Sequence, residues 1–177
     1  MKKFKKKYKR PQRMWSRDRI ESEAELVKNF GLKSKDEIWK AQTLLRKYRR
    51  LARNLVASGN KKVEEELMKK LVAQGILEDK AELDDVLGLT VENILNRRLQ
   101  TVVHRLGLAN TAKHARQLIV HGHVAIGSRK VPFPGYLVLK DEERMVKIIG
   151  EKTKATEAEK AKKPEADATK GNEAVSG

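Results

Sequence analysis

The 177-residue chain has no cysteine and no long apolar run, and each absence removes a class of protein. Without cysteine there are no disulfides and no thiolate metal sites. No apolar stretch approaches the length of about 20 residues that a bilayer-spanning helix needs. The basic N-terminus is not followed by the apolar stretch of a signal peptide. We therefore expect a soluble, intracellular protein with no membrane segment.

Signatures of catalysis are missing as well. The sequence contains no Gly-x-Ser-x-Gly motif and no phosphate-binding glycine loop. No pair of carboxylates lies near His104 or His114 in the sequence. These are the arrangements that activate a nucleophile or hold a nucleotide. We therefore expect a protein that is not an enzyme and that has no cofactor.

Three of the four histidines fall within HARQLIVHGHV at 114–124, which raises the question of a metal site. A zinc site needs about four converging ligands. His114 and His121 are seven residues apart, about 10 Å along a helix, and no acid lies between Glu92 and Asp141. Because the neighbouring side chains are cationic, we expect no metal and interpret the histidines as weak extra donors on a basic surface.

Positive charge is what the chain has in abundance. There are 40 Lys and Arg against 24 Asp and Glu, with a formal net charge of +16. Such an excess favours a polyanionic partner, either nucleic acid or an anionic membrane surface. The net charge is +9 in residues 1–19, +4 in 20–60, −4 in 61–92 and +7 in 93–150, and the remainder is neutral. Two basic regions thus flank an acidic one.

Both ends of the chain are poor in core-forming residues. Residues 151–177 hold one Val and no Leu, Ile, Met or aromatic residue, so we expect a disordered tail. Residues 1–33 are predicted to form a disordered basic arm, in which aromatic residues alternate with cations as in RNA-binding segments. The alternative is a floppy, solubilising extension. The candidate RNA contacts of this arm are Lys5, Lys6, Lys7, Lys9, Arg10, Arg13 and Arg17.

A helical domain is predicted over 34–92. Apolar residues recur every three or four positions along 34–57, which is typical of an amphipathic helix. Ser34 and Glu37 match a capping box at its start. A second helix is predicted over 61–74, ended by Gly75. The residues expected to face the core are Ile38, Ala41, Leu45, Tyr48, Ala52 and Leu55 in the first helix, and Val63, Leu67, Met68 and Leu71 in the second.

Cations cluster on another face of the first helix, with no acid among them. Exposed helix faces normally alternate acids and bases, so this run favours phosphate contact over an ordinary solvated face. The candidate RNA contacts are Arg46, Lys47, Arg49, Arg50 and Arg53.

A smaller module is predicted over 93–150. One helix is expected over 91–107 and a second between the cap residue Thr111 and Gly122. A hairpin at 124–131 and two β segments at 136–139 and 145–149 follow. The fold class is thus α+β, a helical domain beside a helix-loop-helix with a small antiparallel sheet. The candidate RNA contacts are Arg97, Arg98, Arg105, Thr111, Lys113, His114, Arg116, Gln117, His121, Arg129 and Lys130.

Arg116 is the strongest of these candidates. Its planar guanidinium can take two phosphate oxygens, or a phosphate and a base edge. We expect it to act on one face of the second helix together with Lys113, Gln117 and His121.

The stretch RRLQTVVHRLGLANTAKHARQLIVHGHVAIGSRKVPFPGYLV closely resembles the S-four RNA-binding module. The stretches LKSKDEIWKAQTLLRKYRRLARNLVA and LVAQGILEDKAELDDVLGLTVENILNRRLQT resemble the ribosomal protein family that gave the module its name, in its archaeal and eukaryotic branch. The resemblance runs from about Pro11 to Ile149.

This resemblance implies a structural constituent of the small subunit of the cytoplasmic ribosome. It implies direct binding to a multi-helix junction of small-subunit rRNA, support of early assembly and an influence on decoding accuracy. The implied neighbours are other small-subunit proteins, especially the fifth, and mRNA on the side where it enters.

Two other interpretations stay open. RNA-modifying and RNA-charging enzymes use the same module, but they need a catalytic domain, and residues 1–92 are short, basic and helical for that purpose. A non-specific DNA-coating protein would spread its charge over a simple helical repeat without the turn glycines seen after residue 106. Binding to rRNA is the favoured hypothesis.

Overall fold

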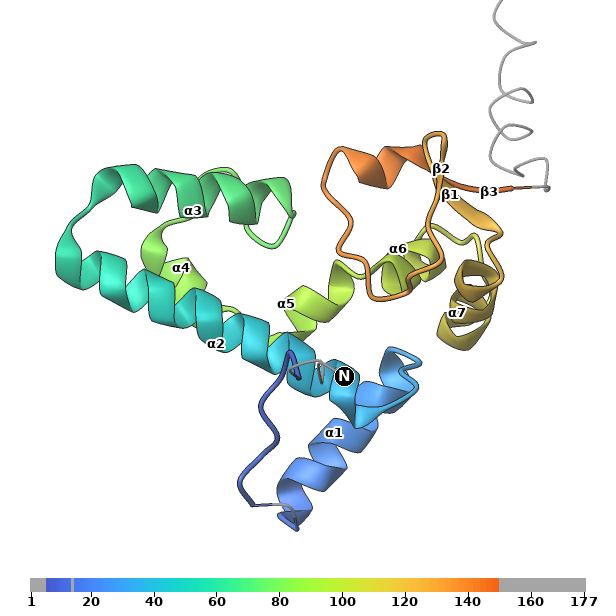
Figure 1. Cartoon of the computed structure of the whole chain (residues 1–177), viewed down its shortest axis with the longest axis horizontal. Helices are drawn as coiled ribbons and strands as arrows, with labels where there is room; N and C mark the ends of the chain where they lie inside the picture. Colours follow the sequence, from blue (N-terminus) through green and yellow to red (C-terminus); the bar gives the residue numbers. More distant parts are fainter. Residues whose placement is uncertain (1–5, 14, 150–177) are drawn as a thin grey trace, which may run out of the picture.

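The computed structural model describes residues 6–13 and 15–149 (Figure 1), so Lys5 and the expected tail at 151–177 lie outside it. Within these residues no helix has the length and apolarity to cross a bilayer. Helices and a small antiparallel sheet confirm the α+β prediction. The elements are α1 (Arg17–Asn29), α2 (Lys35–Ser58), α3 (Lys61–Ala73), α4 (Leu83–Gly88), α5 (Val91–Asn96), α6 (Leu99–Arg105), α7 (Ala112–Val120), β1 (Val124–Ile126), β2 (Arg129–Lys130), η1 (Glu142–Met145) and β3 (Val146–Ile148).

The described residues form two parts with separate apolar cores, which we call the first and the second body. Helix α2 is the long helix of the first body, and α3, α4 and α5 pack along it (Figure 1). Its buried residues are the six that the apolar spacing predicted. In α3, Leu67 and Leu71 face this core as predicted. Val63 does not, because the first turn of α3 is largely exposed. Apolar spacing therefore located the main core of the first body correctly.

The start of α2 departs from the prediction. Ser34 is its N-cap residue, but no side-chain cap hydrogen bond forms there. The backbone N–H of Glu37 instead donates to the Ser34 carbonyl oxygen at 3.2 Å. The Glu37 carboxylate reaches Arg98 and Arg116. Charged donors bind a carboxylate more strongly than a neutral backbone amide does, so the predicted capping box gives way to ion pairs.

The segment expected to be an arm contains helix α1, which the sequence did not predict. Its Glu23 is only 2% exposed and accepts a hydrogen bond from Trp39 Nε1 of α2 at 3.0 Å. Arg19 and Lys35 place their cationic nitrogens 3.6 and 3.5 Å from the same carboxylate. The helix is thus fastened to α2 through a buried carboxylate, and apolar spacing gives no sign of such a contact.

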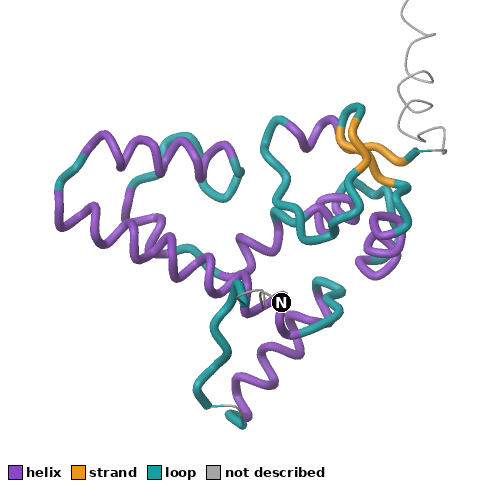
Figure 2. The backbone as a smooth tube through the Cα atoms, in the orientation of Figure 1, coloured by secondary structure: helices purple, strands orange, loops and turns teal. Residues whose placement is uncertain are grey.

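The second body combines α6 and α7 with a small sheet, drawn in orange in Figure 2. The sheet has three strands in the order β2-β1-β3. Both strand pairs are antiparallel, and Ala125 lies opposite Lys130 on one side and Lys147 on the other. Thr111 caps α7 as predicted, because its Oγ1 accepts a hydrogen bond from the His114 backbone N–H at 3.1 Å. A separate apolar core fills this body, with Leu99, Val102, Val103, Ala115, Ile119, Val124 and Val138 fully buried.

The single helix predicted over 91–107 is broken into α5 and α6. Arg98 is extended, with φ −73° and ψ 141°, and the backbone at the break pairs with the loop at 134–138. Leu99 N–H donates to the Tyr136 carbonyl at 2.7 Å, and Val138 N–H donates to the Arg97 carbonyl at 2.9 Å. The strand predicted at 136–139 is thereby reduced to one bridge between Arg98 and Leu137. Long-range backbone pairing outweighs helical continuity here.

Candidate nucleic-acid interface

The outer face of α2 carries four of the five cations predicted there. Helical spacing turns them away from the buried stripe. None of the four forms an ion pair with an acid in the described part of the chain, so their charges are available to a ligand. A surface of this kind suits phosphate groups. The four exposed side chains are Arg46, Lys47, Arg50 and Arg53.

Arg49 has a different place from Arg50 beside it. It is half-buried, and its Nη2 donates to the Leu89 carbonyl oxygen at 2.5 Å. Because Leu89 is the residue that ends α4, this bond ties α4 to α2. The Arg49 guanidinium therefore serves the fold, and its contact with RNA stays a prediction.

A second exposed polar surface lies on α7 and β2. Lys113 and Lys130 carry full charges and pair with no acid among the residues described. Arg129 lies 3.6 Å from Glu142 and 5.9 Å from the ring centre of Tyr136. The exposed candidates on these two elements are Thr111, Lys113, His114, Gln117, His121, Arg129 and Lys130.

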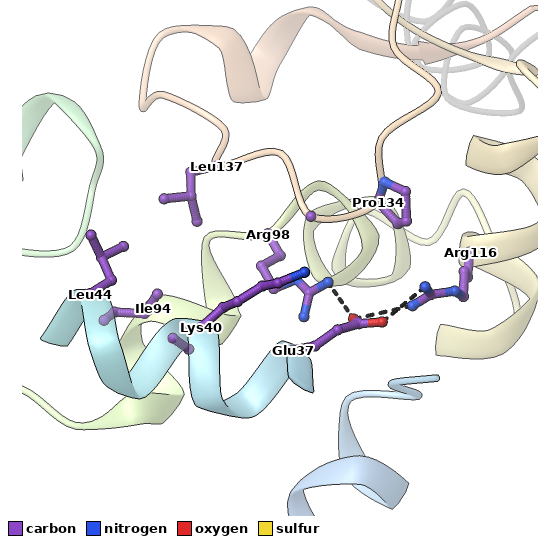
Figure 3. A pocket seen from close by; sticks show the side chains of 10 residues that line it. Glu37, Lys40, Leu44, Ile94, Arg98, Arg116, Pro134 and Leu137 are labelled. Carbon is purple, nitrogen blue, oxygen red and sulfur yellow. Dashed lines mark hydrogen bonds and ion pairs between the residues drawn. The ribbon is translucent and has the colours of Figure 1, made fainter. Parts of the chain in front are cut away.

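Arg116 belongs to a half-buried ion-pair cluster, in which its side chain is 22% exposed and that of Glu37 is 12% exposed. Its Nη2 lies 2.9 Å from Glu37 Oε1, while Arg98 Nη2 lies 2.5 Å from Glu37 Oε2. Figure 3 shows the two arginines reaching Glu37 from different elements. Arg98 is 7% exposed. Arg116 and Arg98 thus share one carboxylate, and their contacts with RNA stay predictions.

Electrostatics favour the ionised form of this carboxylate. Burial by itself raises the pKa of Glu37. The hydrogen bond from Arg116 and the charge of Arg98 outweigh that effect and lower the pKa below its usual value. A carboxylate held between two guanidinium groups stays charged, and it binds α2 to α6 and α7.

Gln100 completes the contact between the two bodies and is 1% exposed. Its Nε2 lies 3.1 Å from the Phe30 carbonyl oxygen, 2.9 Å from that of Gly31 and 3.0 Å from that of Ala112. Its Oε1 accepts from Arg116 Nη1 at 3.2 Å. A Cβ at Gly31, where φ is +58°, would lie 2.8 Å from the Ala112 Cβ, so no side chain fits. We call these four protein residues, Glu37, Arg98, Gln100 and Arg116, the junction, as distinct from a junction of RNA helices.

A second ion-pair group, formed by Arg97, Arg105 and Glu143, lies near the break between α5 and α6. Arg97, 7% exposed, places Nη1 2.8 Å from Glu143 Oε2 and donates from Nη2 to the Val138 carbonyl at 3.0 Å. Arg105 Nη2 lies 2.5 Å from Glu143 Oε1. Burial raises the pKa of Glu143, but the hydrogen bonds and charges of Arg97 and Arg105 outweigh it and lower the pKa. These two arginines thus share Glu143, the Arg105 side chain is still 49% exposed, and their contacts with RNA stay predictions.

The histidines stay on the surface. His104, His114, His121 and His123 are exposed, and His104 Nδ1 lies 3.1 Å from the Ala109 carbonyl oxygen. Nowhere in residues 6–13 and 15–149 do three His, Asp or Glu side chains gather as metal ligands.

Part of the basic arm lies against α2. The Tyr8 ring is 5.8 Å from that of Trp39, and the Lys9 backbone N–H donates to Thr43 Oγ1 at 3.3 Å. Arg17 Nε lies 2.8 Å from Glu21, in an exposed pair. The arm cations that stay exposed without an acid partner among the described residues are Lys6, Lys7, Lys9, Arg10 and Arg13.

Sequence reasoning missed Glu37, Gln100 and Glu143 as the groups that organise this surface. Glu37 gave a signal, but the capping-box pattern absorbed it. Gln100 lies between Leu99 and Thr101 at the start of a helix and had no partner in its own sequence neighbourhood. Most of their partners lie far along the chain, such as Arg116, which is 79 positions from Glu37.

Comparison with known proteins defines the class first. The family model of the S4 domain, an RNA-binding domain, matches residues 97–143, from the break before α6 to η1. Small ribosomal subunit protein uS4 of Methanothermobacter thermautotrophicus is 50% identical over 144 residues, covering 80% of this chain and 84% of the relative. The uS4 proteins of Hyperthermus butylicus and Sulfurisphaera tokodaii are 50% and 48% identical, each covering 82% of this chain and 84% of the relative.

The chain therefore belongs to the uS4 family of small-ribosomal-subunit proteins. This agrees with the resemblance identified from the sequence.

Proposed function

We propose that this protein is a non-catalytic structural constituent of the small subunit of the cytoplasmic ribosome and binds small-subunit rRNA directly, at a multi-helix junction. Its membership of the uS4 family and its S4 domain support this role. One structural observation carries it furthest. The free cations of α2 lie on one body, and the free Lys113 of α7 and Lys130 of β2 lie on the other, and the junction holds the two bodies in one arrangement.

A fixed pair of basic surfaces favours folded RNA over a uniform duplex. Phosphate contacts supply affinity and position, whereas selectivity for RNA comes from shape. A flexible basic protein would bind any polyanion. Two surfaces in a set geometry bind best where RNA helices meet in the matching arrangement.

Salt titration of rRNA binding tests the proposal. Engaging about six to ten phosphates gives a slope of log affinity against log salt of roughly −5 to −9. Small-subunit rRNA is compared with large-subunit rRNA and duplex DNA, and we expect binding to small-subunit rRNA to survive at salt concentrations that abolish the other two. A nearly flat slope, or equal affinity for all three, would contradict the proposal.

The family relationship also supports roles in early assembly and decoding accuracy, beside the fifth small-subunit protein and the side where mRNA enters. Depleting the protein should halt subunit maturation at an early particle, and partial loss of function should raise misreading in a reporter assay. Sedimentation of a native lysate should place the protein with small subunits after a moderate salt wash. Its absence from that fraction would overturn the placement.

A further inference from the structure

A cleft opens beside the junction, between the first turns of α2, the break before α6 and the loop at 134–137 (Figure 3). Its volume is about 360 Å³, within the range of roughly 300–1,000 Å³ found for ligand clefts. Ala41, Leu44, Ile94, Pro134 and Leu137 give it an apolar lining. The cleft thus offers contact area to a flat, uncharged group.

The polar lining of the same cleft is positive. Lys40, Arg98 and Arg116 supply three cations and Glu37 supplies one carboxylate. Because both arginines already share Glu37, the Lys40 ammonium is left exposed, with no acid partner in the described part of the chain. The cleft suits a ligand with an anionic group and an apolar face.

We propose that this cleft receives one unstacked nucleotide of the bound rRNA. The base lies against Leu44 and Leu137, and its phosphate lies beside Lys40. This inference rests on the proposed function, since the RNA supplies the nucleotide. Bases in RNA loops and junctions are often unstacked and held on protein surfaces.

The position of the cleft on α2 favours RNA over an acidic peptide. Lys47 lies seven residues after Lys40, which is about two helical turns, so both lysines lie on one side of α2. Arg50 continues the free cations along the exposed face. An RNA strand that leaves the cleft can place its next phosphates beside these cations. An acidic side chain of a peptide would contact only the cations of the cleft itself.

Gly135 allows the cleft to be filled without removing a charge. It lines the cleft, its φ lies outside the left-handed region, and a Cβ there would first meet Arg98 Nη2 at an ordinary 3.5 Å. Gly135→Leu should therefore block the nucleotide and preserve the fold. Gly88→Leu is the matched control, because Gly88 is exposed on α4 and a Cβ there meets nothing within 4 Å.

The experiment measures affinity for small-subunit rRNA, base-specific chemical modification of that rRNA, and the thermal unfolding midpoint. Gly135→Leu should weaken binding about tenfold, as expected for loss of one base contact. It should also expose to modification a base that the unaltered protein protects. Gly88→Leu should leave affinity and the modification pattern unchanged, and neither variant should shift the midpoint.

Lys40→Gln provides a second test that cannot disturb the core, since Lys40 is exposed. Losing one phosphate contact should reduce the salt slope by about one and deprotect the same base. If Gly135→Leu keeps normal affinity and the normal modification pattern, the cleft inference is wrong. That is also the outcome expected if an acidic peptide fills the cleft. Loss of discrimination between small- and large-subunit rRNA by the unaltered protein would instead overturn the proposed function itself.

Discussion

The arginines of α2 and those at the contact between the two bodies have the same chemistry and opposite surroundings. Arg46, Arg50 and Arg53 are exposed and free of acids among the described residues. Arg97 and Arg98 are each 7% exposed and bound to carboxylates. Arg49, half-buried next to Arg50, shows that a single position separates the two kinds.

This difference teaches that a count of cations overstates an RNA-binding surface. Free arginines contribute to the free energy of RNA binding through contacts with phosphate, and this contribution falls as the salt concentration rises. Buried arginines stabilise the fold, because their guanidinium groups already donate to carboxylates of the same chain. We therefore expect substitutions in the two sets to separate into effects on affinity and effects on stability.

The largest effect should come from breaking the junction. Glu37→Ala leaves the buried Arg98 and the partly exposed Arg116 without their carboxylate. Removing one partner of a buried pair costs about 3–5 kcal/mol, so the free energy of unfolding should fall by about 3 kcal/mol, at the lower end of that range. Denaturant unfolding measures this change. Glu65→Ala is the control, because Glu65 forms an exposed pair with Lys69 and its loss should cost less than about 0.5 kcal/mol. Similar losses for both variants would show that the junction is no stronger than a surface pair.

The next effect should appear in binding. Replacing Arg46, Arg50 and Arg53 together by Ala removes three phosphate contacts, so the salt slope for rRNA should fall by about three. The unfolding midpoint should hardly change. The control triple replaces Lys61, Lys62 and Lys70, which are exposed on α3 in the acidic segment. It removes the same net charge, so an equal drop in slope would mean that total charge, rather than this face, governs binding.

Lowering the pH should destabilise the folded protein less than the Glu37→Ala substitution does. The pKa values of Glu37 and Glu143 are lowered in the folded protein. Their contribution is present well above the ordinary Glu pKa of about 4.3 and is lost as the pH falls through the lower folded-state values. Unfolding measured from pH 7 to pH 3 should show falling stability, and Glu37→Gln should show a shallower fall. An identical pH profile for Glu37→Gln would exclude this role for Glu37.

The smallest effect should come from the histidines. His114 is exposed and forms no ion pair among the described residues, so His114→Ala should change rRNA affinity by less than about 0.5 kcal/mol. Added zinc or a chelator should leave both unfolding and binding unchanged. Unfolding on chelation would show that the stretch at 114–124 is a metal site.

Sequence patterns correctly predicted the features that depend on residues close together in the chain. The buried stripe of α2, the Thr111 cap and the hairpin at 124–131 each depend on residues within a few positions of one another. The break at Arg98 and the role of Glu37 depend on partners dozens of residues away, such as Glu37 and Arg98 at a separation of 61. Sequence spacing carries no signal for such pairs, so it identified the cations but not which of them are free.

Helix α1 makes the same point from the other direction. Its Glu23 looks like an ordinary solvated acid in the sequence, yet it is buried against Trp39 and near Lys35. The charge density of residues 1–19 favoured a disordered arm. Only the tertiary contact with α2 indicates that part of this segment forms a helix.

The most direct test of the central claim compares Arg97→Ala with Arg50→Ala, each measured by denaturant unfolding and by salt titration of rRNA binding. Arg97→Ala should lower the free energy of unfolding by about 2–4 kcal/mol and leave the salt slope unchanged. Arg50→Ala should leave the free energy of unfolding within about 0.5 kcal/mol and reduce the slope by about one. If instead Arg97→Ala lowers the slope without loss of stability, or Arg50→Ala destabilises the fold, the division between free and structural arginines is contradicted.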